Sequence, residues 1–246
     1  MSVGADALVS FWSELPQDRP PFIHPRDVLP RGSYDGTISS FADWKRRFLL
    51  GDLSRSTFHV NLPPLPYTGD LANAEIVLLL TNPGFDPGDY HAYETDKVFR
   101  DMTWATLRQE VSTNYQLDPC FGWTPAFRWW EGKVRKIAEI IATERFGGRY
   151  GAALTDLARR ICAVEQVPYR SQDARIPSGL RSSEEARRFV RSLSDDRTII
   201  VLRSARGWSV PPGPNVVTYT SGQARGASLG PTTPGGMAIL RAFGID

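Results

Sequence analysis

The stretch VLLLTNPGF, Val77 to Phe85, takes four apolar residues directly into a Thr-Asn-Pro-Gly turn. A short, bounded apolar run is typical of a β-strand that is buried on both faces. The Pro and Gly that follow prevent the strand from continuing. We therefore expect a central strand at Glu75–Leu80, which ends by presenting the polar side chain of Asn82 at one edge of a sheet.

Further apolar runs and helical patterns extend this picture along the chain. The other expected strands are Ile161–Val167, Thr198–Leu202 and Asn215–Tyr219. The expected helices are Ser40–Leu50, about 97–111, about 126–145, Gly151–Arg160, Ser182–Leu193 with a capping box from Ser182 to Glu185, and a last helix from its N-cap Thr233 to Phe243. Strands that alternate with helices predict right-handed parallel crossovers. The predicted fold class is α/β: a three-layer α/β/α fold with a central, mostly parallel four-stranded sheet.

The first quarter of the chain has a different character. Residues 16–38 are rich in Pro, Gly and Asp and predict an irregular surface segment. Prolines keep Asn61–Asp70 extended, because they forbid helix. We expect residues 1–61 to form an N-terminal helical and irregular segment that packs on the core formed by residues 62–246.

The composition is that of an ordinary soluble protein, with 246 residues, 41% hydrophobic and 23% charged. The first twenty residues do not read as a secretory signal, and no run approaches the length of a membrane span. Cys120 and Cys162 are too few for a four-ligand metal site, and His24 and His59 have no metal-ligand spacing. We expect reduced thiols, no metal, no cofactor and a cytoplasmic location.

The basic residues are mostly arginine, since only four of the 29 are lysine. Arginine binds phosphate in a bidentate manner and stacks on bases, so this preference suits a nucleic-acid partner. A GC-rich genome, which favours arginine codons everywhere, is the alternative, because the excess is diffuse rather than a stripe.

Polar segments follow every predicted strand. They are TNPGF (81–85), EQVPYR (165–170), RSARGW (203–208) and TSGQARG (220–226). Ligands of parallel sheets bind outside the carboxyl ends of the strands, so these segments predict a binding site. The first segment is not a phosphate loop, and Ser204 and Ser221 lack the sequence context of a catalytic nucleophile.

A strand, then Asn-Pro-Gly, then an aromatic residue resembles the first motif of the uracil-DNA glycosylase (UDG) superfamily, in the form found in its mismatch-specific and single-strand-selective branches. The resemblance implies a UDG-like catalytic domain at residues 62–246. It places Asn82 at the position that holds the attacking water. It places Pro83 and Gly84 in the turn that lets the backbone approach a flipped nucleotide. A plain structural turn is the alternative for this tripeptide.

The same resemblance implies roles for later residues. The candidates for stacking on the flipped base are Phe85, Tyr90 and Tyr93. Glu165 takes the position of the residue that reads the base, which is commonly Asn in the superfamily. Gln166 follows it directly and is the second candidate. Thr220–Pro231 replaces a loop that often carries a His-Pro-Ser signature, and it lacks that His. The resemblance therefore leaves the stabilisation of the departing base without its usual residue.

A glutamate at the reading position favours a cytosine-type base. An ionised carboxylate only accepts hydrogen bonds, so it repels uracil O4 and pairs with the cytosine amino group. A structural ion pair of Glu165 with Arg170 or Arg203 is the alternative. A register shift of one residue would transfer the role to Gln166.

Excision of ordinary cytosine would destroy a bacterial cell's own genome, so a cytosine reader implies a modified base. The chain is compatible with UDG-like glycosylases of phage defence, which remove glucosylated hydroxymethylcytosine. Aromatic side chains suited to a sugar are Trp123, Phe127, Trp129 and Trp130. Since Trp129 and Trp130 are adjacent on a helix, we expect at most one of them to face the site.

The predicted partner is double-stranded DNA with a flipped base, with no membrane and no obligate protein partner. The candidate DNA contacts are Arg203, Arg206, Ser221, Gln223 and Arg225. His91 is a weaker candidate, since a loop His is more often merely polar surface. A monofunctional enzyme is expected because Lys97, the only lysine near the motif, lies on a predicted helix. Uracil or deaminated-base repair, and a catalytically silent nucleic-acid-binding module, are the alternative functions.

Overall fold

A five-stranded, mostly parallel sheet forms the centre of the computed structural model, which describes residues 3–173 and 176–245. The strands are β1 (Tyr67–Thr68), β2 (Ile76–Leu80), β3 (Ile161–Glu165), β4 (Thr198–Val201) and β5 (Val216–Thr218). Their order in the sheet is β1-β3-β2-β4-β5, and only β1 is antiparallel to its neighbour. The four predicted strands are confirmed as a parallel set. The predicted number of four is wrong, because part of the proline-rich extended segment pairs with β3 as an edge strand.

The helices are α1 (Val3–Trp12), α2 (Phe41–Leu49), α3 (Pro87–Thr95), α4 (Lys97–Leu107), α5 (Pro125–Phe146), α6 (Tyr150–Arg160), α7 (Arg181–Arg191), α8 (Ala205–Trp208), α9 (Ser221–Gly226) and α10 (Pro234–Ala242), with 3-10 turns η1 (Tyr115–Leu117) and η2 (Pro119–Phe121). The six predicted helices are present as α2, α4, α5, α6, α7 and α10, and α1 lies in the N-terminal segment that was expected to be helical and irregular. The helices α3, α8 and α9 were not predicted. The last helix has the predicted N-cap, Thr233, which accepts a hydrogen bond from the Gly236 amide.

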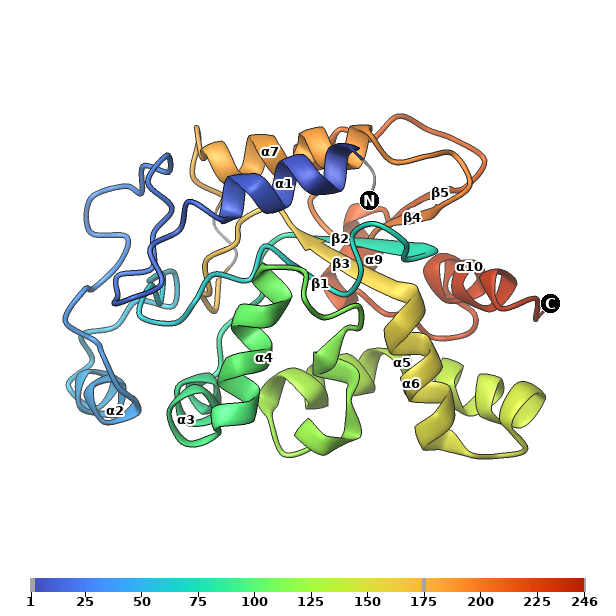
Figure 1. Ribbon diagram of the computed structural model, residues 1–246, viewed down its shortest axis with the longest axis horizontal. Helices are drawn as coiled ribbons and strands as arrows, with labels where there is room; N and C mark the ends of the chain where they lie inside the picture. Colours follow the sequence, from blue (N-terminus) through green and yellow to red (C-terminus); the bar gives the residue numbers. More distant parts are fainter. Residues whose placement is uncertain (1–2, 174–175, 246) are drawn as a thin grey trace.

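Alternate side chains of β2 enter two separate hydrophobic clusters. Ile76, Leu78 and Leu80 pack with α5, α6 and α10. Val77 and Leu79 pack with α1 and α7. Because successive strand residues point to opposite faces, helices cover both sides of the sheet, as Figure 1 shows. This arrangement is compatible with a three-layer α/β/α fold.

The N-terminal segment contributes directly to the second cluster. Leu8, Phe11 and Trp12 of α1 are buried in it, and α1 packs along α7 (Figure 1). The division of the chain at residue 61 stays a prediction.

The start of α7 differs from the predicted capping box. The N-cap is Leu180 and makes no side-chain cap. The Ser182 amide instead donates to the Asp27 carboxylate at 2.8 Å. The helix therefore begins earlier than expected, because an aspartate 155 residues away in sequence supplies its cap.

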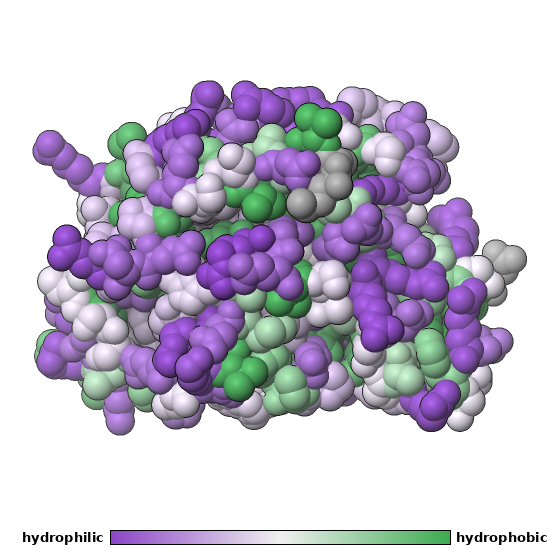
Figure 2. Space-filling model, in the orientation of Figure 1, coloured by the Kyte–Doolittle hydropathy of each residue, from purple (hydrophilic) through white to green (hydrophobic). Residues whose placement is uncertain are grey.

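Hydrophilic side chains make up most of the outer face seen in Figure 2, and hydrophobic ones form small separate groups. Within the described residues, no helix combines the length and the apolar character needed to cross a membrane.

Candidate functional site

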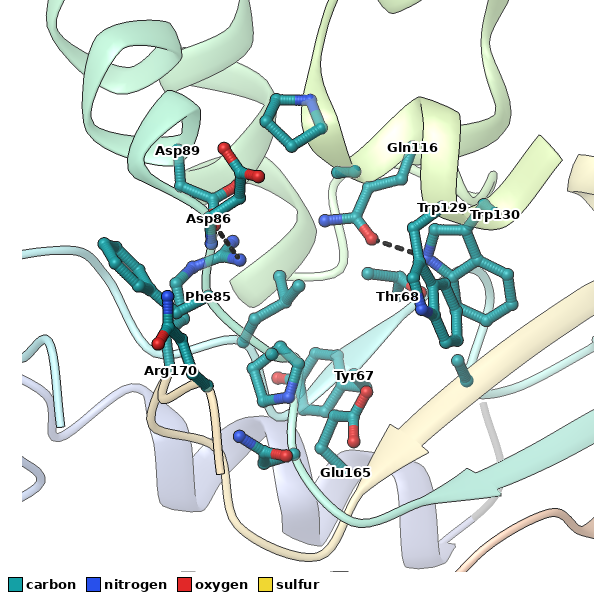
Figure 3. Close-up of a pocket in the computed structure, with 18 of the residues that line it drawn as sticks. Tyr67, Thr68, Phe85, Asp86, Asp89, Gln116, Trp129, Trp130, Glu165 and Arg170 are labelled. Atoms are coloured by element: carbon teal, nitrogen blue, oxygen red, sulfur yellow. Dashed lines mark hydrogen bonds and ion pairs between the residues drawn. The ribbon is translucent and has the colours of Figure 1, made fainter. Parts of the chain in front are cut away.

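A pocket of about 440 Å³ lies at the carboxyl ends of β2 and β3. Figure 3 shows side chains from several elements around this common space, with Tyr67 and Glu165 from the sheet opposite Gln116, Trp129 and Trp130. The volume lies within the range of small-molecule sites, about 300–1,000 Å³. The predicted site residues that line the pocket are Asn82, Pro83, Gly84, Phe85, Glu165 and Arg203. The fold thus brings the first motif, the reading position and one candidate phosphate contact into one cavity.

Asn82 is held in a fixed orientation by Ser171. Its Nδ2 donates to the Ser171 backbone oxygen at 3.0 Å and to the Ser171 Oγ at 3.2 Å. The amide donor is therefore engaged, and the acceptor Oδ1 is left for a ligand or a water. Gly84, two residues later, has φ +70° and no atom within 4 Å of a hypothetical Cβ. The turn thus needs glycine for its backbone conformation and leaves open space beside the motif.

The buried rings of His59 and Tyr90 pack against Phe85. His59 stacks on it with ring centroids 3.5 Å apart, and Tyr90 meets its edge at 5.7 Å. Burial is the main cause that lowers the pKa of His59 to about 3, so this imidazole is neutral at pH 7. Trp44 also packs against Phe85, with ring centroids 6.2 Å apart, and Phe85 still lines the pocket. Tyr90 itself does not line the pocket. Tyr93 does not line it either, and its hydroxyl accepts a hydrogen bond from Trp104.

Glu165 ends β3 and Gln166 follows it, and their side chains lie in different surroundings. Glu165 lines the pocket and is 6% exposed. The Gln166 side chain is buried elsewhere, where its Oε1 accepts a hydrogen bond from the Ser204 hydroxyl at 2.6 Å. Of the two candidates for reading a base, the structure places only Glu165 at the pocket.

The alternative of a structural ion pair for Glu165 is wrong in this structure. Neither Arg170 nor Arg203 lies within ion-pair distance of Glu165, and Arg170 pairs with the buried Asp89 at 3.6 Å instead (Figure 3). Burial raises the pKa of Glu165 to about 8, against the opposing effect of Arg203 and then Arg170. The carboxyl is therefore neutral at pH 7, where it has one donor and one acceptor. The expected repulsion of uracil O4 applies only where Glu165 is ionised, above about pH 8.

Both tryptophans of the adjacent pair line the pocket, contrary to the expectation that at most one would. The Trp130 Nε1 donates to the Gln116 Oε1 at 2.8 Å, which fixes the buried ring (Figure 3). Trp129 is 39% exposed and lies at right angles to Trp130. Pro125 and Ala126 line the pocket as well, so it lies against the N-terminal part of α5. Phe127 and Trp123 do not line the pocket.

The walls of the pocket contain buried polar atoms without a hydrogen-bond partner. They are Thr68 Oγ1, Glu165 Oε2 and Arg203 Nε. Leaving a buried polar group unpaired is costly. The described residues contain nine such atoms, and three of them belong to residues that line this one cavity.

The remaining candidate DNA contacts lie outside the pocket. Arg206 is exposed on α8, and Ser221, Gln223 and Arg225 are exposed on α9. The Gln223 side chain also caps α9 by accepting from the Thr220 amide. These residues follow β4 and β5, so they lie at the same edge of the sheet as the pocket. Their contact with DNA stays a prediction, as does any role of the exposed His91.

The fold brings a second lysine near the site. Lys133 of α5 lies 5.4 Å from the Trp129 ring centre and donates to the Gly226 carbonyl at 2.6 Å. Burial, with Arg203 nearby, lowers its pKa. It is absent from the pocket lining, and Lys97 is engaged with Asp101 on the surface. Over residues 3–173 and 176–245 there is also no group of three or more His, Cys, Asp or Glu that could hold a metal.

Three residues in or beside the pocket had no clear signal in the sequence. Ser171 bonds to Asn82, His59 stacks on Phe85, and Thr68 is placed by the backbone pairing of β1 with β3. The Asp89–Arg170 pair likewise joins α3 to the loop after β3. These contacts form only because the fold places the ends of β2 and β3 side by side.

No protein-family model matches this sequence, and no curated protein or solved structure matches it either.

Proposed function

We propose that the protein is a monofunctional DNA glycosylase of the UDG-like fold, which flips a modified base out of DNA and excises it to leave an abasic site. One observation carries this proposal: a single pocket unites an oriented Asn82, the platform of Phe85 and the buried carboxyl of Glu165. A purely structural turn gives no reason for the fixed amide, the supported ring and the unpaired polar atoms to share one cavity.

The chemistry of base release suits these groups. The bond from C1′ to the base nitrogen breaks as positive charge grows on the sugar and negative charge grows on the base. Asn82 Oδ1 accepts a hydrogen bond from a water and so aligns it with C1′, and an amide does not compete as a strong base. Phe85 provides a surface on which a flipped base stacks.

The substrate we propose is a cytosine with a bulky 5-substituent, such as glucosylated hydroxymethylcytosine in phage DNA. The pocket holds room and side chains beyond those a bare base requires, namely the exposed ring of Trp129 and the rim residues Arg55, Asp86 and Gln172. An aromatic surface with polar groups at its edge is suited to a sugar. This extension of the pocket supports a modified base over an unmodified one.

Uracil is the second candidate, and the neutral state of Glu165 favours it. A protonated carboxyl donates to uracil O4 as readily as it accepts from a cytosine amino group. Substrate preference therefore depends on the 5-substituent as much as on the reading residue.

The test is the substitution Asn82→Ala. Duplexes with uracil, cytosine, hydroxymethylcytosine or glucosylated hydroxymethylcytosine are incubated with the protein, and abasic sites are revealed by alkaline cleavage. We expect the wild type to act on the glucosylated base. We expect Asn82→Ala to lower the rate at least about 100-fold, within the usual effect of losing a positioned catalytic group, while DNA affinity is retained.

Asn73→Ala is the matched control, because Asn73 is an exposed asparagine that bonds only to Asp70 nearby. Release of uracil alone would transfer the proposal to uracil repair. Binding of DNA without release of any base would support a silent binding module instead.

A further inference from the structure

The carboxyl of Glu165 is the most unusual group in the pocket. It rises from the last residue of β3, opposite Leu80 of β2, and its backbone is fixed by a hydrogen bond from its amide to the Pro66 carbonyl. Its Oε2 is buried without any partner. A rigid, buried acid that faces a cavity and lacks an ion pair is able to exchange a proton with whatever enters.

We infer that Glu165 is the general acid of the excision, and that its carboxyl gives a proton to the departing base. This inference rests on the proposed function, and it supplies the group that stabilises the departing base. The departing base accumulates negative charge, and the last loop, Thr220–Pro231, contains no histidine to stabilise it. Cytosine has an unprotonated N3 that accepts such a proton.

The electron pair of the C1′–N1 bond moves onto the base, and the Glu165 proton moves to N3, so the base leaves as a neutral molecule. A water bound at Asn82 adds its oxygen to C1′ and releases a proton. That proton restores the Glu165 carboxyl. The net reaction consumes one water and yields the free base and an abasic sugar.

The charged groups that face Glu165 fit this role. Arg203 after β4 and Arg170 after β3 are the charged groups that act on its carboxyl, and both favour its ionised form. The effect of burial outweighs that of the two arginines, so the pKa of Glu165 is about 8 and the carboxyl is protonated at neutral pH. After transfer, the two guanidinium groups stabilise the carboxylate that forms. An acid with a pKa near the working pH is the most effective proton donor.

The experiment measures the single-turnover rate of base release between pH 6 and pH 10. The substrate is whichever of the four duplexes, with uracil, cytosine, hydroxymethylcytosine or glucosylated hydroxymethylcytosine, the wild type acts on. The wild-type rate should fall tenfold per pH unit above about pH 8, where Glu165 loses its proton. Glu165→Gln keeps the size of the side chain, with one acceptor oxygen and an amide donor, but it has no transferable proton. Its rate should be about 10²- to 10⁴-fold lower, with no fall at high pH and unchanged DNA affinity.

Two further variants make the test decisive. Glu165→Asp keeps a transferable proton on a shorter side chain, so it should be slower than the wild type and still lose rate at high pH. Glu184→Gln removes a surface carboxylate that pairs with Arg181, and it should behave as the wild type. If Glu165→Gln does not fold, the pH profile of Glu165→Asp decides.

The inference is overturned if Glu165→Gln keeps its rate, or if it slows but still loses rate above pH 8, since another group would then be the acid. A wild type that releases none of the four bases would remove the proposed function, and the inference with it. Activity of the wild type therefore distinguishes failure of the proposed function from failure of the inference about Glu165. Where the wild type is active, the Glu165 variants alone test the inference.

Discussion

The adjacent side chains of Glu165 and Gln166, at the end of β3, lie in different surroundings. Glu165 enters the pocket, and Gln166 is buried against Ser204. Glu165 is the last residue of β3 and Gln166 follows it, so a shift of one residue in the pairing with β2 would exchange an acid for an amide at the same place. The chemistry proposed for the site depends on that register.

The buried carboxyl also makes stability depend on pH. The folded pKa of Glu165, about 8, lies above its value in an unfolded chain, so the unfolded state loses this proton first as pH rises. The free energy of unfolding should therefore fall between about pH 4.5 and pH 8, by roughly 1.4 kcal/mol per pKa unit and several kcal/mol in total.

Urea unfolding of the wild type and of Glu165→Gln checks this at pH 5 and pH 8.5. The glutamine variant cannot ionise, so it should gain stability relative to the wild type at the higher pH. An equal difference at both pH values would show that Glu165 is already ionised in the folded protein.

Among the elements, α7 depends most clearly on a distant residue. Asp27 accepts hydrogen bonds from the Ser182 amide at 2.8 Å and from the buried Tyr169 hydroxyl at 2.6 Å. Asp27 thus joins the N-terminal segment, the first turn of α7 and the loop after β3, which also carries Arg170 and Ser171.

Asp27→Ala should therefore lower the free energy of unfolding by about 1–3 kcal/mol. Loss of the cap accounts for about 1 kcal/mol, and the loss of the acceptor for the Tyr169 hydroxyl proton adds to it. Chemical denaturation measures the loss, with Asp18→Ala as control because Asp18 is exposed. No change in stability would mean that water replaces the carboxylate at both donors.

At the scale of the whole molecule, the parallel topology gathers the loops after β2, β3, β4 and β5 at one edge of the sheet. The pocket lies at this edge, and exposed arginines of α8 and α9 lie beside the later strands. A duplex whose flipped base enters the pocket would run along this edge.

Single substitutions Arg203→Ala, Arg206→Ala and Arg225→Ala should each weaken DNA binding and flatten its salt dependence. Each lost phosphate contact lowers the slope of log K against log salt by about 0.9. Fluorescence anisotropy at several salt concentrations gives the slopes. Arg191→Ala is the control, because the C-terminal end of α7 lies at the opposite edge of the sheet. Unchanged slopes for all three would place DNA on another face.

The elements that could be predicted from the sequence are those with local signals. Bounded apolar runs predicted β2 to β5, and the Thr-Pro start predicted α10. The helix α3 was missed because PGDYHAYET has no apolar period, although Asp86 and Pro87 form a recognisable start. The edge strand β1 was missed because two residues gain their pairing only from β3.

The sequence by itself determined the parallel strands and the position of Asn82 at a strand end, because a buried strand and its turn are encoded by neighbouring residues. Only the tertiary structure decided how Asn82 is oriented, since Ser171 lies 89 residues away. It also decided the protonation of Glu165, because burial in the pocket outweighs the attraction of two arginines. Orientation and pKa arise from groups that meet only in the folded chain, so no local pattern contains them.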